Sequence, residues 1–132
     1  MAAIVGNQKE KKTVRTCSDL NVYRQSFALA KEVLELTKKL TKEDAYSLCD
    51  QLRCASRSIL NNIAKGWAKR KYANVFIKQL NDASGSCEET KLLLQFAIDC
   101  HYPERKRFEA LSKACDEVGA MLNFLIKNRR TF

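Results

Sequence analysis

The sequence predicts an all-α protein in which four antiparallel helices form an up-down-up-down bundle. Apolar residues recur at spacings of three and four along four long segments, which is the pattern of a helix with one face turned toward a core. Breakers are scarce, since the 132 residues include four glycines and one proline. Four amphipathic helices with short connections bury their apolar faces around one shared core, so we expect a bundle.

The first helix is expected over residues 19–40, with Ser18 or Asp19 as its cap. The stripe expected to face the core is Leu20, Tyr23, Phe27, Ala30 and Leu34. A second apolar stripe, about a third of a turn away, is Leu29, Val33, Leu36 and Leu40. A helix that packs against the core along one face needs only one of these two stripes.

Each of the other helices has one clear stripe. The second helix, over residues 43–67, carries Leu48, Leu52, Ala55, Ile59 and Ile63. The third, over residues 72–101, carries Phe76, Leu80, Ala83, Cys87, Leu94 and Ile98. Pro103 is expected in the first turn of the fourth helix, where its missing amide hydrogen costs nothing. That helix carries Phe108, Leu111, Cys115, Val118, Leu122 and Leu125.

Surplus apolar surface favours a homo-oligomer. Besides the second stripe of the first helix, Leu92, Leu93 and Phe96 face away from the core stripe of the third. Large exposed apolar patches usually mark interfaces. The alternative is a thick core in which tilted helices cover both stripes.

The composition is that of a globular protein, with 45% hydrophobic and 30% charged residues. No apolar run approaches the roughly 20 residues that span a bilayer. The start, MAAIVGNQKEKK, reaches charged residues too early for a signal peptide, so we expect a cytoplasmic protein. We expect a flexible basic N-terminal arm over residues 1–18, a bundle domain over 19–129 and a basic C-terminal tail over 130–132.

The residues give no indication of catalysis, a metal or a cofactor. The six cysteines form no C-x-x-C pair and there is one histidine, which favours reduced, mostly structural thiols. Cys100 and His101 are adjacent, whereas the members of a catalytic dyad must converge in space. The chain lacks a nucleophile elbow, a phosphate-binding glycine loop and a Glu-x-x-His motif. We expect no enzyme; a metal or thiol sensor at Cys100 and His101 is a further alternative.

The formal net charge of +9 is concentrated in three segments. Residues 1–18 contribute +3, from Lys9, Lys11, Lys12 and Arg15 against Glu10. Residues 65–71 contribute +4, from Lys65, Lys69, Arg70 and Lys71. Residues 127–132 contribute +3, from Lys127, Arg129 and Arg130. In an up-down-up-down bundle, the three segments meet at one end of the molecule.

Concentrated positive charge attracts polyanions, so these basic residues are candidates for contact with RNA or DNA phosphates. Trp67 and Tyr72 could stack on bases, worth on the order of 1–3 kcal/mol per base, if their rings are exposed. Arg53 and Arg57, four residues apart on the second helix, are candidates for a nucleic-acid or subunit contact. The alternatives are solvated charges that complement helix dipoles, aromatic rings that cap the core, a salt-bridged helix face, or a basic end that docks an acidic protein.

Four collinear blocks resemble a known family: DLNVYRQSFALAKEVLELTKKL, QLRCASRSILNNIAKG, ASGSCEETKLLL and DEVGAMLNFLIK. They are similar to the bacterial four-helix bundle proteins encoded by intervening sequences in 23S ribosomal RNA genes. Related to that family are the accessory variability proteins of diversity-generating retroelements. The resemblance covers residues 19–129.

The resemblance implies a ring-shaped homo-oligomer, typically a pentamer, with a basic surface and a non-enzymatic role. Its retroelement branch binds a reverse transcriptase and the RNA that the enzyme copies. Leu60 departs from the family, which often has a proline there that would kink the second helix. Lys65 and Lys91 stand where the family often has acids, and both changes increase the positive charge.

Overall fold

The computed structural model describes residues 14–40 and 45–128 of the chain. Within these ranges, a short 3-10 helix η1 (Cys17–Asp19) precedes four α-helices. These are α2 (Asn21–Lys38), α3 (Tyr46–Ala68), α4 (Ala73–Asp99) and α5 (Arg105–Lys127), and the described residues form no strand. The predicted all-α class is confirmed.

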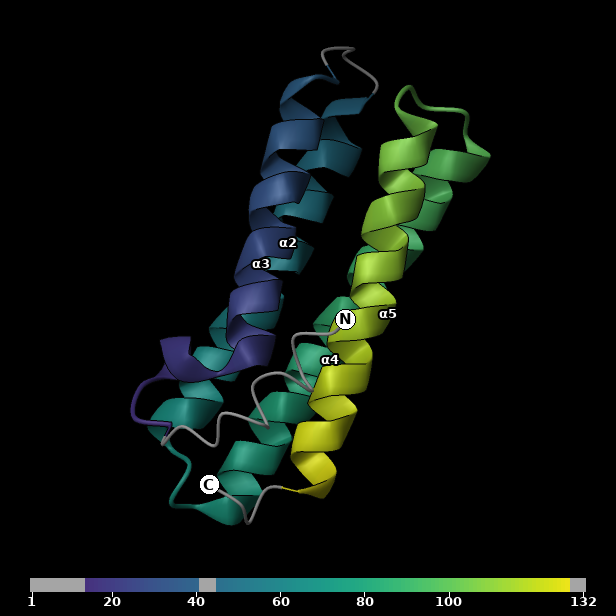
Figure 1. Cartoon of the computed structure of the whole chain (residues 1–132). Helices are drawn as coiled ribbons and strands as arrows, with labels where there is room; N and C mark the ends of the chain where they lie inside the picture. The colour runs from purple at the N-terminus through teal and green to yellow at the C-terminus, as the bar shows by residue number, and fades with distance from the viewer. Residues whose placement is uncertain (1–13, 41–44, 129–132) are drawn as a thin grey trace.

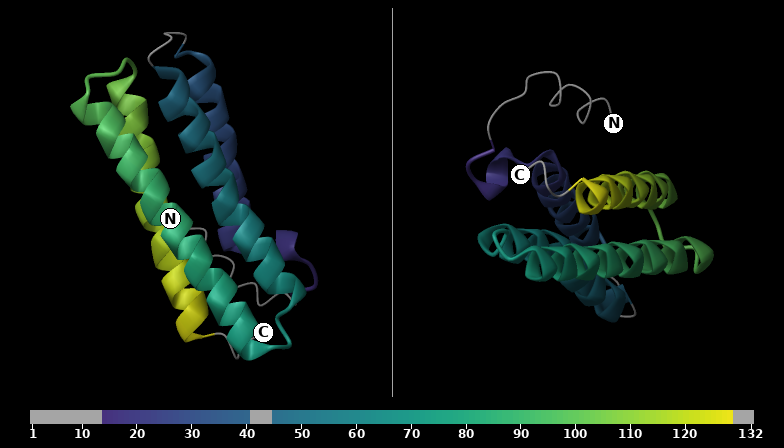
Figure 2. Two further views of the ribbon diagram at one scale, coloured as in Figure 1. Left: turned by 180° about the vertical axis from the view of Figure 1, so that it is seen from behind. Right: turned by 90° about the horizontal axis from the view of Figure 1, so that it is seen from below.

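The four helices run alternately up and down (Figure 1). Each contacts its neighbours in the order α2, α3, α4, α5 and back to α2, so that they enclose one core. Figure 2 shows α3 and α4 on the side opposite α2 and α5. The start of α2, the turn between α3 and α4, and the end of α5 lie at the same end of the bundle (Figure 1), which confirms the predicted chain direction.

The core includes all of the predicted stripes of the last three helices. All five predicted residues of α3, all six of α4 and all six of α5 are buried. The largest side chains that lose all contact with solvent include Phe108, Leu52, Ile59, Leu80 and Leu94. Burying a side chain of this size contributes about 1.5–3 kcal/mol, so this shared interior is the main source of stability.

In α2 the predicted core stripe is only partly buried: Leu20 and Ala30 are buried as expected, but Phe27 and Leu34 are not. Leu29, Val33 and Leu36 face the core with at most 2% exposure, whereas Phe27 is 47% exposed and Leu34 39% exposed. Both stripes have the helical period, so periodicity does not decide which one turns inward. The packing of α2 against both α3 and α5 selects the stripe of Leu29, Val33 and Leu36. The expected core assignment of Phe27 and Leu34 was therefore wrong.

The start of α2 also differs from expectation. Its N-cap residue is Leu20, which provides no side-chain cap. The carboxylate of Asp19 instead accepts the backbone N–H groups of Arg15 at 2.9 Å and Thr16 at 3.0 Å, and so closes η1. These two bonds to the ionised form lower the pKa of Asp19.

The turn between α4 and α5 places Pro103 outside the last helix. The N–H of His101 bonds to the carbonyl of Ile98, and the N–H of Tyr102 bonds to the carbonyl of Ala97, which is a Schellman termination of α4. His101 adopts the left-handed conformation, with φ of 59°, that this motif requires. Glu104 is also left-handed, with φ of 71°, and α5 therefore begins after it rather than at Pro103.

Candidate nucleic-acid interface

Five of the predicted contact residues lie at the end of the bundle where α3 and α5 finish and α4 begins (Figure 1). Lys65 is in the last turn of α3, Lys69 is its C-cap residue, and Lys127 is the last residue of α5. Arg70 and Lys71 occupy the turn before α4. All five are exposed, and we call this group the basic pole.

The helix ends around the basic pole carry almost no acidic residues. The chain has no Asp or Glu between Asp50 and Asp82, nor any after Glu117, so the pole ends of α3, α4 and α5 carry no carboxylate. Asp19 of η1 is an acidic residue, but its carboxylate already accepts hydrogen bonds from backbone N–H groups. The positive charges are therefore not neutralised by the described part of this chain, and the local potential attracts anions.

Trp67 does not have the exposed ring that stacking on a base requires. It is only 6% exposed and belongs to the core, so its assignment as a stacking residue was wrong. The guanidinium of Arg70 lies over its ring, 4.1 Å from the centroid, and donates a hydrogen bond of 2.9 Å to its carbonyl. Trp67 thus anchors the turn and holds Arg70. Tyr72, 57% exposed, and Phe124 in the last turn of α5, 48% exposed, are aromatic rings at this end that remain accessible.

Gly66 allows α3 and α4 to approach each other beside the pole. A Cβ atom at this position would lie 3.1 Å from Cβ of Gln79 and 3.4 Å from the ring of Phe76. The missing side chain lets these helices pack closely, which places the following turn and its cations.

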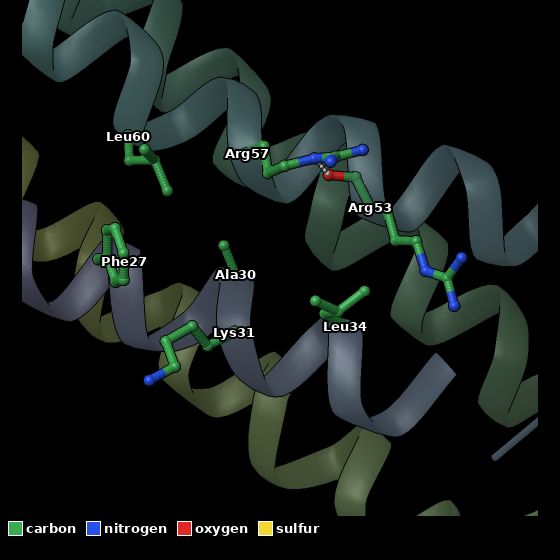
Figure 3. A pocket seen from close by; sticks show the side chains of 7 residues that line it. All are labelled: Phe27, Ala30, Lys31, Leu34, Arg53, Arg57 and Leu60. Atoms are coloured by element: carbon green, nitrogen blue, oxygen red, sulfur yellow. Dashed lines mark hydrogen bonds between the residues drawn. The ribbon is translucent and has the colours of Figure 1, made fainter. Parts of the chain in front are cut away.

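Arg53 and Arg57 lie in the middle of α3 and do not belong to the basic pole. The Nε–H of Arg53 donates to Oγ1 of Thr37 in α2 at 2.8 Å, and the Nε–H of Arg57 donates to the carbonyl of Arg53 at 3.1 Å. Both side chains line a groove between α2 and α3 (Figure 3). The two arginines are therefore separated from the other predicted contact residues.

Several predicted charges lie outside the described residues. These are Arg129 and Arg130 of the C-terminal tail and Lys9, Lys11 and Lys12 of the N-terminal arm. Of the cations in that arm, Arg15 is described, and it is exposed directly before η1. The domain boundaries proposed at residues 18 and 129 therefore remain predictions.

The described residues hold no group of three or more His, Cys, Asp or Glu side chains that could bind a metal ion. All six cysteines are free thiols, of which Cys54 and Cys100 are exposed. Burial raises the pKa of Cys17 and Cys49, which keeps these thiols protonated. His101 has a clear structural place as the left-handed residue that terminates α4.

The groove between α2 and α3 is the feature that sequence reasoning missed. It is lined by Phe27, Ala30, Lys31, Leu34, Arg53, Arg57 and Leu60. The signal was present as the extra apolar stripe of the first helix, but the sequence assigned the wrong stripe to the surface. None of the helices in the described ranges carries an apolar stretch long enough to cross a lipid bilayer.

Comparison with known proteins agrees with the fold. A crystal structure of a protein of unknown function from the S23 ribosomal protein family of Bacteroides thetaiotaomicron superposes with a TM-score of 0.74. The two sequences are 26% identical, and the match covers 81% of this chain and 96% of the other. A search among curated proteins finds no match.

The family model of the 23S rRNA-intervening sequence protein matches residues 18–124. That range contains all four helices except the last turn of α5, and therefore the packing that brings the α3–α4 turn to the end of the bundle. With this match over most of its length and the shared fold, the chain belongs to the 23S rRNA-intervening sequence protein family.

Proposed function

We propose that the protein is a non-enzymatic accessory protein that binds RNA or DNA through the phosphate backbone at its basic pole. The observation that carries the proposal is the gathering of Lys65, Lys69, Lys71 and Lys127 at an end of the bundle where α3, α4 and α5 carry no carboxylate. A protein that neutralises phosphates with such cations releases counterions, and this release drives binding without sequence specificity.

The helix ends at the pole add to this function. α4 begins there, and no side chain caps its first N–H groups, which favours an anion. Arg70 is held in place by Trp67, so little side-chain freedom is lost when its guanidinium meets a phosphate. Tyr72 offers an exposed ring for stacking.

The proposal extends to assembly and partners, which the family resemblance and the exposed apolar side chains support. Leu92 and Phe96 of α4 are 69% and 56% exposed, which supports a homo-oligomer. The resemblance supports a pentameric ring and a partnership with a retroelement reverse transcriptase. The proposed location is the cytoplasm. A ring would present several basic poles to one nucleic acid, and avidity would strengthen weak contacts.

The second candidate function is a protein-interaction scaffold in which the basic pole docks an acidic protein and no nucleic acid binds. The positive potential of the basic pole supports this function too, because it attracts an acidic protein surface as it attracts a nucleic acid. Binding of unrelated RNAs over a range of salt concentrations separates the two. Retention with a steep salt dependence supports the first function, and no retention supports the second.

The variant that tests the basic pole is K65Q/K69Q/K71Q. It leaves Arg70 in place, because the contact of Arg70 with Trp67 also stabilises the turn. We expect filter retention of single-stranded RNA to weaken and the slope of log K against log salt to fall by about 2, since each phosphate contact contributes roughly 0.7.

The matched control is K39Q/K106Q/K113Q, which removes the same charge from exposed lysines away from the pole. If only net charge mattered, RNA binding would weaken equally in both variants. The proposal instead predicts a large loss of RNA retention only for the pole variant. Equal retention by the wild type and the pole variant would exclude the assignment.

A further inference from the structure

The groove between α2 and α3 has an apolar floor. Phe27 and Leu34 are seven residues apart on α2, and Ala30 lies between them on the same face (Figure 3). Leu60 of α3 closes the opposite side, and the space has a volume of about 210 Å³. An exposed phenylalanine and leucine beside this groove form an apolar surface, and burying it against a partner would be energetically favourable.

The rim of this groove is positive. Lys31, Arg53 and Arg57 line it, and no carboxylate does. No acid in the described ranges forms an ion pair with these three cations. The Nε hydrogen bonds of Arg53 and Arg57 fix both guanidinium groups beside the apolar floor.

The later half of α4 presents the complementary surface. Leu92 and Phe96 are the exposed large hydrophobic residues of this helix, and Glu88, Glu89 and Asp99 are exposed on the same face. The lysine in this segment, Lys91, is half-buried and held by Asp116 of α5 at 2.6 Å. This face of α4 therefore combines apolar side chains with net negative charge.

We propose that the α2–α3 groove binds the acidic, apolar face of α4 of a second copy of this chain. Leu92 and Phe96 of one copy cover Phe27 and Leu34 of the next, while Glu88 and Glu89 approach Lys31 and Arg57. This proposal rests on the proposed homo-oligomer and names the surfaces that build it.

The positions of the two surfaces define the kind of contact. Leu34 and Phe96 each lie within four residues of a helix end, and both ends are at the pole opposite the basic one (Figure 1). A second copy can therefore be rotated about an axis along the bundle, without inversion. Because the surfaces differ, the contact is heterologous, and it forms a ring when the rotation closes. All basic poles then lie on the same side of the assembly.

The proposal assigns Arg53 and Arg57 to a contact between subunits rather than to nucleic acid. Arg53 contacts Thr37 of α2 and Arg57 contacts the backbone of α3, so both are placed by the helix pair that forms the groove. Their distance along α3 from the basic pole agrees with this separate role.

The experiment uses two charge-reversed variants of the full chain, K31E/R57E in the groove and E88R/E89R on α4. Sedimentation velocity is measured for each at equal concentration, with circular dichroism to show that each is folded. We expect the wild type to sediment as a multiple of 15.1 kDa and each variant alone as a monomer of about that mass. The control K113E reverses an exposed charge on α5 and keeps the wild-type mass.

Mixing the two variants provides the decisive measurement. In the mixture, the acidic groove meets the basic α4 face, while the native groove of one variant meets the native α4 face of the other. Assembly is therefore expected to return on mixing, although each variant alone is monomeric. The mass reports this contact without reference to nucleic acid, so its outcome is independent of the retention assay.

Three outcomes would overturn the proposal. A wild-type protein that stays monomeric at its highest soluble concentration has no such contact. Folded variants that keep the wild-type mass place the interface elsewhere. Folded monomeric variants that do not associate on mixing show that these two surfaces do not bind each other. The groove would then bind a different protein.

Discussion

Small residue choices control the geometry of the basic pole. Gly66 lies in the last turn of α3 against Phe76 and Gln79 of α4, and Trp67 beside it fills the core while holding Arg70. The sequence suggested that the ring of Trp67 stacks on a base, but the ring is buried in the core and anchors the turn. The cation above its ring adds a favourable cation–π contact in this turn.

Replacement of Gly66 by alanine is expected to lower stability by about 1 kcal/mol. Alanine gains about 1 kcal/mol of helix propensity, but its Cβ would meet the backbone-attached Cβ of Gln79 at 3.1 Å, and overpacking costs about 1–3 kcal/mol. The control is G119A on α5, where the new Cβ meets nothing within 4 Å and stability is expected to rise. Thermal unfolding at one protein concentration measures both, and a G66A protein as stable as G119A would contradict the close approach.

At the scale of the helices, α3 and α4 are joined by polar contacts as well as by the core. The hydroxyl groups of Ser58 and Ser86 are 2.7 Å apart across the two helices. The side-chain amide of Asn62 donates to the carbonyl of Ser58, and the hydroxyl of Thr90 donates to the carbonyl of Ser86. This row of small polar side chains lets the helices pack closely and fixes their relative position along the axis.

The hydroxyl pair is expected to behave as one unit in a double-mutant cycle. S58A leaves the half-buried hydroxyl of Ser86 without its partner across the helices, and S86A leaves the hydroxyl of Ser58 with only the side-chain amide of Asn62; each is expected to cost about 1 kcal/mol. The double variant removes both groups, so its cost is expected to be smaller than the sum of the single costs. Urea unfolding measures the cycle, and strictly additive costs would show that the two hydroxyl groups do not interact.

At the scale of the whole molecule, the proposed subunit contact runs along the side of the bundle, whereas the basic pole is at one end of it. The connection between them is avidity, because a ring with its poles on one side offers several sites to one polyanion. No change within a subunit is needed for this coupling. It requires the direction of the helices, which places the α3–α4 turn and the end of α5 together (Figure 1).

The variant E88R/E89R provides a strict test of this coupling. It raises the formal charge of each chain by four, from +9, and net charge alone would strengthen binding to RNA. Loss of the assembly is instead expected to weaken retention of a long RNA by about 100-fold. Retention of an RNA too short to contact two poles is expected not to fall. Tighter binding of the long RNA by this variant would contradict the role of avidity.

The sequence alone predicted the four helices, the core faces of α3, α4 and α5, and the chain direction that brings the basic segments together. Each of these depends on patterns along the chain: a single apolar stripe per helix and connections too short for any other order. The basic pole was predictable for the same reason, since the positions of its charges follow from where the helices end.

Only the tertiary structure decided which stripe of α2 faces the core, that Trp67 is buried, and that Arg53 and Arg57 belong to a groove. Two stripes with the same helical period are equivalent until α3 and α5 provide surfaces to pack against. The local sequence determines where a helix forms and how its side chains are arranged around it. The rotation of that helix about its own axis is set by the surface area it buries against its neighbours, and those neighbours come from distant parts of the chain.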